Sequence, residues 1–90
     1  MNIIKKEIPV TELLAGLAEE ASELAQAALK LRRVFDKTNP TPTNEEEAIE
    51  HLWEEIADVK LYVSMLDVNP REISRIMCEK QKRWESRLAR

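Results

Sequence analysis

Hydrophobic residues recur every three or four positions over most of the chain, which is the spacing of an α-helix that packs on one side. In a first stretch, residues 12–34, the positions sharing this side are Leu13, Leu17, Glu20, Leu24, Ala27 and Leu31. In a second stretch, which ends at about residue 66, they are Ile49, Leu52, Ile56, Val59, Val63 and Leu66. A third stretch begins at Pro70, runs almost to residue 90 and presents Ile73, Met77, Trp84 and Leu88. The pattern predicts three long helices.

Turn and capping residues set the expected boundaries of these helices. Thr11 is the predicted N-cap of the first helix. The one turn-rich segment, DKTNPTPTN at residues 36–44, links the first helix to the second. Either Thr43 or Asn44, each followed three residues later by a glutamate, opens the second helix with a capping box. Asn69, with a proline directly after it, is a strong start signal for the third helix.

Composition supports an all-α fold in a single domain, residues 1–90. The chain has 90 residues, 43% of them hydrophobic, with one glycine and four aromatic residues, and this suits helices better than a sheet. We expect an antiparallel helical bundle of three long helices, with room for a short N-terminal helix and for a break in the second helix. Because so short a chain buries little surface, we expect oligomerisation, as a homodimer or homotetramer, to complete the bundle.

Charge is unevenly distributed along the chain. Residues 1–70 hold seven Lys or Arg against fourteen Asp or Glu, whereas residues 71–90 hold seven against three. An acidic body repels a nucleic-acid backbone, and twenty mildly basic residues do not make a convincing groove-binding helix. We therefore expect no nucleic acid among the main partners.

Neither disulfide nor membrane chemistry is expected. Cys78 is the single cysteine, so it forms no internal disulfide, and no Cys/His cluster has the spacing of a zinc site. The first ten residues lack the long apolar run of a signal peptide or a membrane span. We expect a cytoplasmic protein that does not bind membranes.

Carboxylates stand in or beside the packing faces of the first two helices. Glu20 occupies a position of the first apolar stripe, and Glu23 lies three residues further, on the adjoining flank. Glu55 borders the apolar stripe of the second helix, with Asp58 again three residues further. If the two helices pack antiparallel, four carboxylates share one small volume, and their mutual repulsion destabilises the fold unless a positive charge lies among them.

Such a set of oxygen ligands suits a hard divalent cation, chiefly Mg²⁺ or Mn²⁺. Magnesium held by carboxylates usually shares its remaining positions with water and phosphate oxygens. Lys80 stands in the apolar face of the third helix, with Arg83 and Arg87 at helical spacing from it. These three residues are the candidate phosphate-binding groups, although the stem of Lys80 can equally cover apolar surface with its ammonium in water.

The segments LAEEASEL and EEIADV together resemble the paired ExxE and ExxD signature of the MazG-like, all-α nucleoside triphosphate pyrophosphohydrolases. Glu20 and Glu23 match the first pair, Glu55 and Asp58 the second. The resemblance implies that these four residues are catalytic and bind Mg²⁺, that water attacks the α-phosphorus, and that a nucleoside monophosphate and pyrophosphate are released. The family's basic residues on the last helix are similar to Lys80 and Arg83.

The resemblance leaves the substrate open. Thirty-one residues separate Glu23 from Glu55, which is on the long side for the family. We favour a small nucleotide pyrophosphohydrolase of house-cleaning type. Phosphoribosyl-ATP pyrophosphohydrolases, dUTPases and dCTPases carry similar carboxylate pairs and are alternatives within the same superfamily. Trp53, Tyr62 and Trp84 are candidates for stacking on a nucleobase, although aromatic residues at helical spacing are more often core residues.

Other classes of protein compete with this interpretation. The four carboxylates also fit surface salt bridges in a non-catalytic helical oligomer that acts as a scaffold or adaptor. A di-iron carboxylate bundle requires a glutamate three residues before a histidine, but the single histidine, His51, has Ala48 at that place. His51 is therefore interpreted as a surface or hydrogen-bonded residue. With Gly16 as the single glycine, a glycine-rich phosphate loop is excluded.

Overall fold

The computed structural model of the protein describes residues 7–39 and 44–89, and in them it contains three long helices and no strand. Helix α2 spans Val10–Phe35, α3 spans Glu45–Met65 and α4 spans Pro70–Leu88. The all-α class and the three helices are thus confirmed, with boundaries one or two residues from those predicted. Helix α3 runs without the expected break. The expected N-terminal helix and the Thr43 cap involve residues outside the described part of the chain.

Capping residues start α3 and α4 as predicted, but not α2. The Asn44 side chain accepts hydrogen bonds from the amides of Glu46 and Glu47, and the Asn69 side chain caps α4 in the same way, with a proline at the first turn. The prediction of Thr11 as the cap of α2 is wrong. Helix α2 begins earlier, because the carbonyl of Pro9 accepts the first backbone hydrogen bonds, so Thr11 lies inside the first turn.

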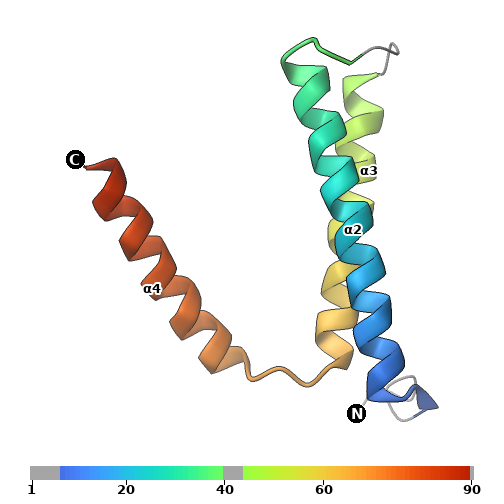
Figure 1. The fold of residues 1–90 in the computed structure, drawn as a ribbon, viewed down its shortest axis with the longest axis vertical. Coiled ribbons are helices and arrows are strands. Elements are labelled where there is room, and N and C mark those ends of the chain that lie inside the picture. Colours follow the sequence, from blue (N-terminus) through green and yellow to red (C-terminus); the bar gives the residue numbers. More distant parts are fainter. Residues whose placement is uncertain (1–6, 40–43, 90) are drawn as a thin grey trace.

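Helices α2 and α3 lie side by side as an antiparallel hairpin (Figure 1). Their register is fixed by Gly16 on α2, because a Cβ at this position would clash with the ring and the hydroxyl of Tyr62 on α3. Tyr62 therefore lies directly against the backbone of α2. Counting in opposite directions from this pair sets Glu20 opposite Asp58 and Glu23 opposite Glu55. The register thus brings the two carboxylate pairs to the same level of the hairpin.

The buried face of α2 is the predicted one, whereas that of α3 is rotated. Leu13, Ala27 and Leu31 of the predicted α2 stripe are buried. On α3 the buried residues are Ala48, Glu55 and Met65, whereas the predicted stripe is half-buried except at Val63, which is exposed. Gly16 on α2 leaves room for the Tyr62 ring, and this contact brings the Tyr62 side of α3 toward α2. Glu55 consequently lies within the packed face, where the sequence pattern had placed it at the border.

Helix α4 stands apart from the hairpin (Figure 1). Among the described residues, α2 and α3 make the one extensive helix–helix contact, and none of the residues of α4 is buried. Asp67, in a left-handed conformation with φ 57°, turns the chain after α3 and directs α4 away. The predicted three-helix bundle is therefore a two-helix hairpin plus a separate third helix within one chain.

The exposed surface is correspondingly large. The radius of gyration is 16.7 Å, against about 12 Å expected for a compact chain of this length. The accessible surface is 7580 Å², against about 5,400 Å² expected for a compact monomer of the same mass. In the described part of the chain, no helix combines the length and the apolar character required to cross a bilayer.

Candidate metal and phosphate site

Three carboxylates from the two hairpin helices meet between them. Glu20 and Glu23 come from α2 and Glu55 from α3, and each offers one oxygen within 4.8 Å of the oxygens of the other two. We call these three residues the acidic cluster. The three-residue spacing on α2 sets its two carboxylates on one side of the helix, and the register of the hairpin brings Glu55 opposite them. The structure therefore assembles three of the four predicted metal ligands.

Two oxygens of the acidic cluster are buried without a hydrogen-bonding partner. Glu55 is only 8% exposed, and its Oε2 accepts no hydrogen bond from the protein. The same is true of Oε2 of Glu20. The other oxygen of Glu55, Oε1, lies 3.2 Å from Nε2 of His51, one turn earlier on α3. A buried carboxylate oxygen without a partner is costly, because it has lost its hydration and gained nothing in return. A cation bound by these oxygens removes that cost.

The acidic cluster also perturbs the acid–base chemistry of Glu20. Burial, a hydrogen bond with the Glu23 side chain and the negative charges of Glu23, Asp58 and Glu55 raise the pKa of Glu20 to about 7. All these causes disfavour the ionised carboxylate. In the absence of a cation the cluster therefore retains a proton close to neutral pH.

Asp58, the fourth predicted ligand, lies at the edge of the acidic cluster. Its side chain is exposed and does not belong to the group of three that converge within 4.8 Å. Its charge nevertheless acts on Glu20, because it contributes to the raised pKa of that residue. The structure thus places Asp58 next to the cluster, but outside its buried centre.

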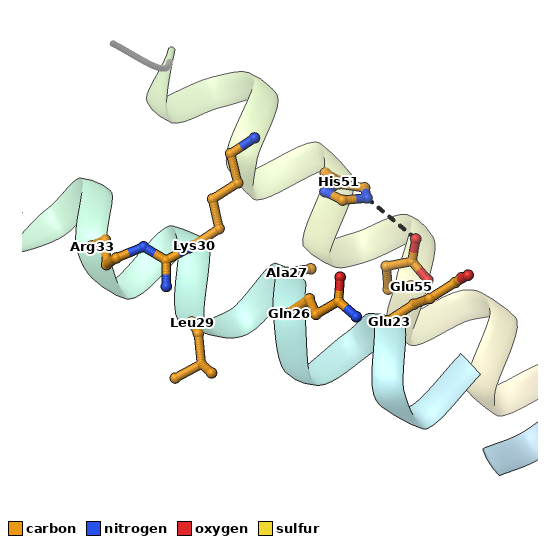
Figure 2. Close-up of a pocket in the computed structure, with 8 residues that line it drawn as sticks. All are labelled: Glu23, Gln26, Ala27, Leu29, Lys30, Arg33, His51 and Glu55. Carbon is orange, nitrogen blue, oxygen red and sulfur yellow. Dashed lines mark ion pairs between the residues drawn. The ribbon is translucent and has the colours of Figure 1, made fainter. Parts of the chain in front are cut away.

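A groove of about 600 Å³ opens beside the acidic cluster, between α2 and α3 (Figure 2). We call it the α2–α3 groove. It is lined by Glu23, Gln26, Ala27, Leu29, Lys30, Arg33, His51 and Glu55. Figure 2 shows the two glutamates at one end and Lys30 with Arg33 at the other. The groove therefore has an acidic end and a basic end.

The opposite side of the acidic cluster is occupied by side-chain packing. Tyr62, one turn beyond Asp58 on α3, lies against Gly16, one turn before Glu20 on α2. Its ring fills the space between the helices at this level. Tyr62, a predicted nucleobase-stacking residue, is thereby engaged in the helix–helix interface.

The predicted phosphate-binding residues are not brought to the acidic cluster within one chain. Lys80, Arg83 and Arg87 lie on α4, which stands apart from the hairpin, and all three are exposed. Lys80 lines a separate hollow with Met77, Gln81 and Trp84. Helical spacing correctly placed these basic residues near one another, but it contains no information on where α4 lies.

The two tryptophans proposed for base stacking are likewise distant from a common site. Trp53 is 64% exposed on α3, and Trp84 is 67% exposed on α4. Neither lines the α2–α3 groove. Both remain available to a partner molecule, but the structure of one chain gives them no shared ligand.

Lys30 and Arg33 are the groove residues that the sequence analysis missed. A signal was present: Lys30 follows Glu23 by seven residues, or two helical turns, and therefore shares its side of α2. In the sequence, Lys30 and Arg33 look like ordinary charged residues on the solvent-exposed side of a helix, as Arg32 does. They differ from Arg32 in the structure, because they line the α2–α3 groove.

Comparison with known proteins adds no relative. No family model matches the chain, and neither a curated protein nor a solved structure does.

Proposed function

We propose that the protein is a Mg²⁺-dependent nucleoside triphosphate pyrophosphohydrolase, with Mn²⁺ as a possible substitute for Mg²⁺. The observation that carries the proposal is the pair of buried, unpartnered oxygens, Oε2 of Glu20 and Oε2 of Glu55, in a cluster of three converging carboxylates. An all-oxygen donor set of this kind fits a hard divalent cation. The proposal also agrees with the resemblance of the two carboxylate pairs to the MazG-like signature.

In this proposal Glu20, Glu23 and Glu55 hold the cation, and Asp58 joins them from the edge of the cluster. A bound Mg²⁺ supplies Lewis acidity toward phosphate oxygens and lowers the pKa of a water ligand. In the reaction, the water oxygen bonds to the α-phosphorus and the bond to the α–β bridging oxygen breaks. The bonding electrons leave with pyrophosphate, and the proton released by water passes to solvent.

We further propose that the protein works as a homo-oligomer. Each chain exposes about 2,200 Å² more than a compact monomer of its mass. Two copies covering this excess would bury an area in the range of obligate homodimers, about 2,000–5,000 Å². The apolar face of α4 contributes to this exposed surface, with Met77 63%, Trp84 67% and Leu88 85% exposed. A phosphate-binding role for Lys80, Arg83 and Arg87 requires such a second copy.

A non-catalytic scaffold is the second candidate, because the exposed apolar face of α4 equally fits a purely structural assembly. Thermal unfolding with and without Mg²⁺ or Mn²⁺ distinguishes the two. A scaffold should melt at the same temperature in both conditions, whereas a preformed metal site should melt higher as the metal concentration rises.

The enzymatic proposal is tested by assaying pyrophosphate release from a panel of standard and modified NTPs and dNTPs with Mg²⁺. The panel includes dUTP and dCTP, and phosphoribosyl-ATP is assayed beside it, since these are the alternative substrates within the superfamily. We expect metal-dependent turnover of at least one compound. If the folded protein with metal turned over none of them, the enzymatic proposal would be wrong.

A further inference from the structure

The α2–α3 groove carries opposite charges at its two ends. Glu23 and Glu55 of the acidic cluster form one end, and Lys30 and Arg33 form the other. At a rise of 1.5 Å per residue, Glu23 and Lys30 are separated by about 10 Å along the axis of α2. A ligand that lies along the groove therefore meets the cation site first and two basic side chains next.

Neither basic residue forms a salt bridge in the described part of the chain. The charge of Arg33 does act on Asp36, whose pKa is lowered by hydrogen bonds from Thr38 and by the charges of Arg32 and Arg33. Among the described residues, the ion pairs are those of His51 with Glu55 and of Arg75 with two glutamates on α4, and Lys30 and Arg33 take part in none. Lys30 is half-buried against the hairpin, and Arg33 is exposed at the rim. Two cations without a salt-bridge partner that border one groove, in the basic last turns of α2, form a local site for anions.

The direction of a ligand is restricted as well. Tyr62 packs on Gly16 at one side of the acidic cluster, while the α2–α3 groove opens at the other. If one phosphate group of a chain is bound at the cation site, the rest of the chain has room only along the α2–α3 groove. Lys30 and Arg33, which can balance its negative charge, lie in that direction.

We propose that Lys30 and Arg33 form a phosphate-binding subsite for the part of a polyphosphate that extends beyond the metal-bound phosphate. The ligand class is a chain of two or more phosphates. Resting on the proposed function, this assigns the β- and γ-phosphates, which become the pyrophosphate product, to the basic end of the groove. Phosphate recognition is thereby supplied within one chain, by α2, independently of α4.

The experiment uses isothermal titration calorimetry of the full chain with Mn²⁺ present and inorganic phosphate, pyrophosphate and tripolyphosphate as ligands. For the wild type we expect affinity to rise with the length of the phosphate chain. Because the double variant K30Q/R33Q loses two charged donors to the phosphates, it should bind tripolyphosphate roughly a hundredfold more weakly or worse. In this double variant, the increase in affinity from inorganic phosphate to tripolyphosphate should largely disappear.

Arg32→Gln is the matched control. Arg32 has the same charge on the same helix, but it lines a different hollow, with Phe35 and Leu52. This variant should bind tripolyphosphate within about threefold of the wild type, since only screened, long-range attraction is lost. Arg33→Gln alone, at an exposed position that does not support the fold, should show an intermediate loss.

Two results would overturn the subsite: wild-type affinity that does not depend on phosphate chain length, or equal losses in K30Q/R33Q and Arg32→Gln. The Mn²⁺ affinity without phosphate should be unchanged in K30Q/R33Q, and a loss there would also contradict the assignment. Failure of the proposed function has a different signature. Tripolyphosphate binding that depends on Lys30 and Arg33, without pyrophosphate release from any NTP, would keep the subsite and reject the enzyme.

Discussion

The hairpin of α2 and α3 and the separate helix α4 differ in how much of their apolar surface is buried. Both are amphipathic, but the hairpin buries part of its apolar faces against itself. It holds Glu55, which is buried, and Glu20, which is half-buried, at the same contact, with Glu23 exposed beside them. Helix α4 also carries an apolar face, interrupted by Lys80, and none of its described residues is buried. An apolar pattern therefore shows which side of a helix can pack against another surface. A charged residue buried in a helix–helix contact indicates where a ligand of opposite charge can bind.

The largest effect should come from removing a carboxylate of the hairpin rather than one of α4. Glu55→Gln should reduce the rate of pyrophosphate release to less than about one hundredth of the wild-type rate. Loss of a metal ligand should have a larger effect than loss of a residue that hydrogen-bonds to a ligand, which costs about ten- to hundredfold. The helical signal in circular dichroism should remain. The matched control is Glu79→Gln on α4, an exposed residue paired with Arg75, and it should keep full activity. Equal losses in the two variants would remove the functional distinction between the regions.

The contrast in stability comes next. Leu13 is 3% exposed in the hairpin, so Leu13→Ala should lower the free energy of unfolding by about 2–5 kcal/mol. Ile73, on α4, is 43% exposed, and Ile73→Ala should cost less than about 1 kcal/mol in dilute solution. Urea unfolding at several protein concentrations measures both. A cost for Ile73→Ala that grows with protein concentration would show that α4 packs in an oligomer.

A third test uses the raised pKa of Glu20, about 7, in the hairpin. Metal binding must displace the shared proton, so Mn²⁺ affinity should rise about tenfold per pH unit up to pH 7 and then level off. The sign is opposite for the metal-free fold. Since the folded state holds this proton more tightly than the unfolded state, stability should fall as pH rises from about 4.5 to 7. A pH-independent affinity would contradict the acidic cluster as the binding site.

The smallest expected effect is a gain in stability without metal. Glu20→Gln removes a charge that Glu23, Asp58 and Glu55 all repel, so at pH 8 it should raise the melting temperature of the metal-free protein by a few degrees (~2–5 °C). At pH 5, where Glu20 is already neutral, the difference should vanish. Glu72→Gln on α4 serves as the comparison, and it should not stabilise at either pH, because Glu72 is paired with Arg75. A lower melting temperature for Glu20→Gln at pH 8 would indicate a structural role instead.

Most of the local structure could be predicted from the sequence. Asn44 and Asn69 act as caps because their side chains fit the free amides of a first turn, and such signals are local. The convergence of Glu20, Glu23 and Glu55 followed from helical spacing plus the assumption of antiparallel packing. The caps needed only short-range geometry, whereas the convergence of the three glutamates also needed the antiparallel packing of α2 and α3 that Figure 1 shows.

What could not be predicted depends on how the helices approach each other. Large apolar residues suggested the packed stripe of α3, whereas the contact follows Ala48, Glu55 and Tyr62, with the tyrosine ring on Gly16. The Tyr62 ring fits against Gly16 because glycine has no side chain. A pattern of hydrophobic residues gives no sign of such a close contact. The position of α4 depends on the turn at Asp67, so the charges of Lys80 and Arg83 could not be located from spacing.

The most direct test of a metal site between α2 and α3 is a Mn²⁺ titration followed by the electron paramagnetic resonance signal of the free ion. A metal site at the acidic cluster predicts that the wild type and Glu79→Gln bind Mn²⁺ with the same affinity, and that Glu55→Gln leaves Mn²⁺ free in solution. Equal Mn²⁺ binding by the wild type and Glu55→Gln, or none by either, would contradict it.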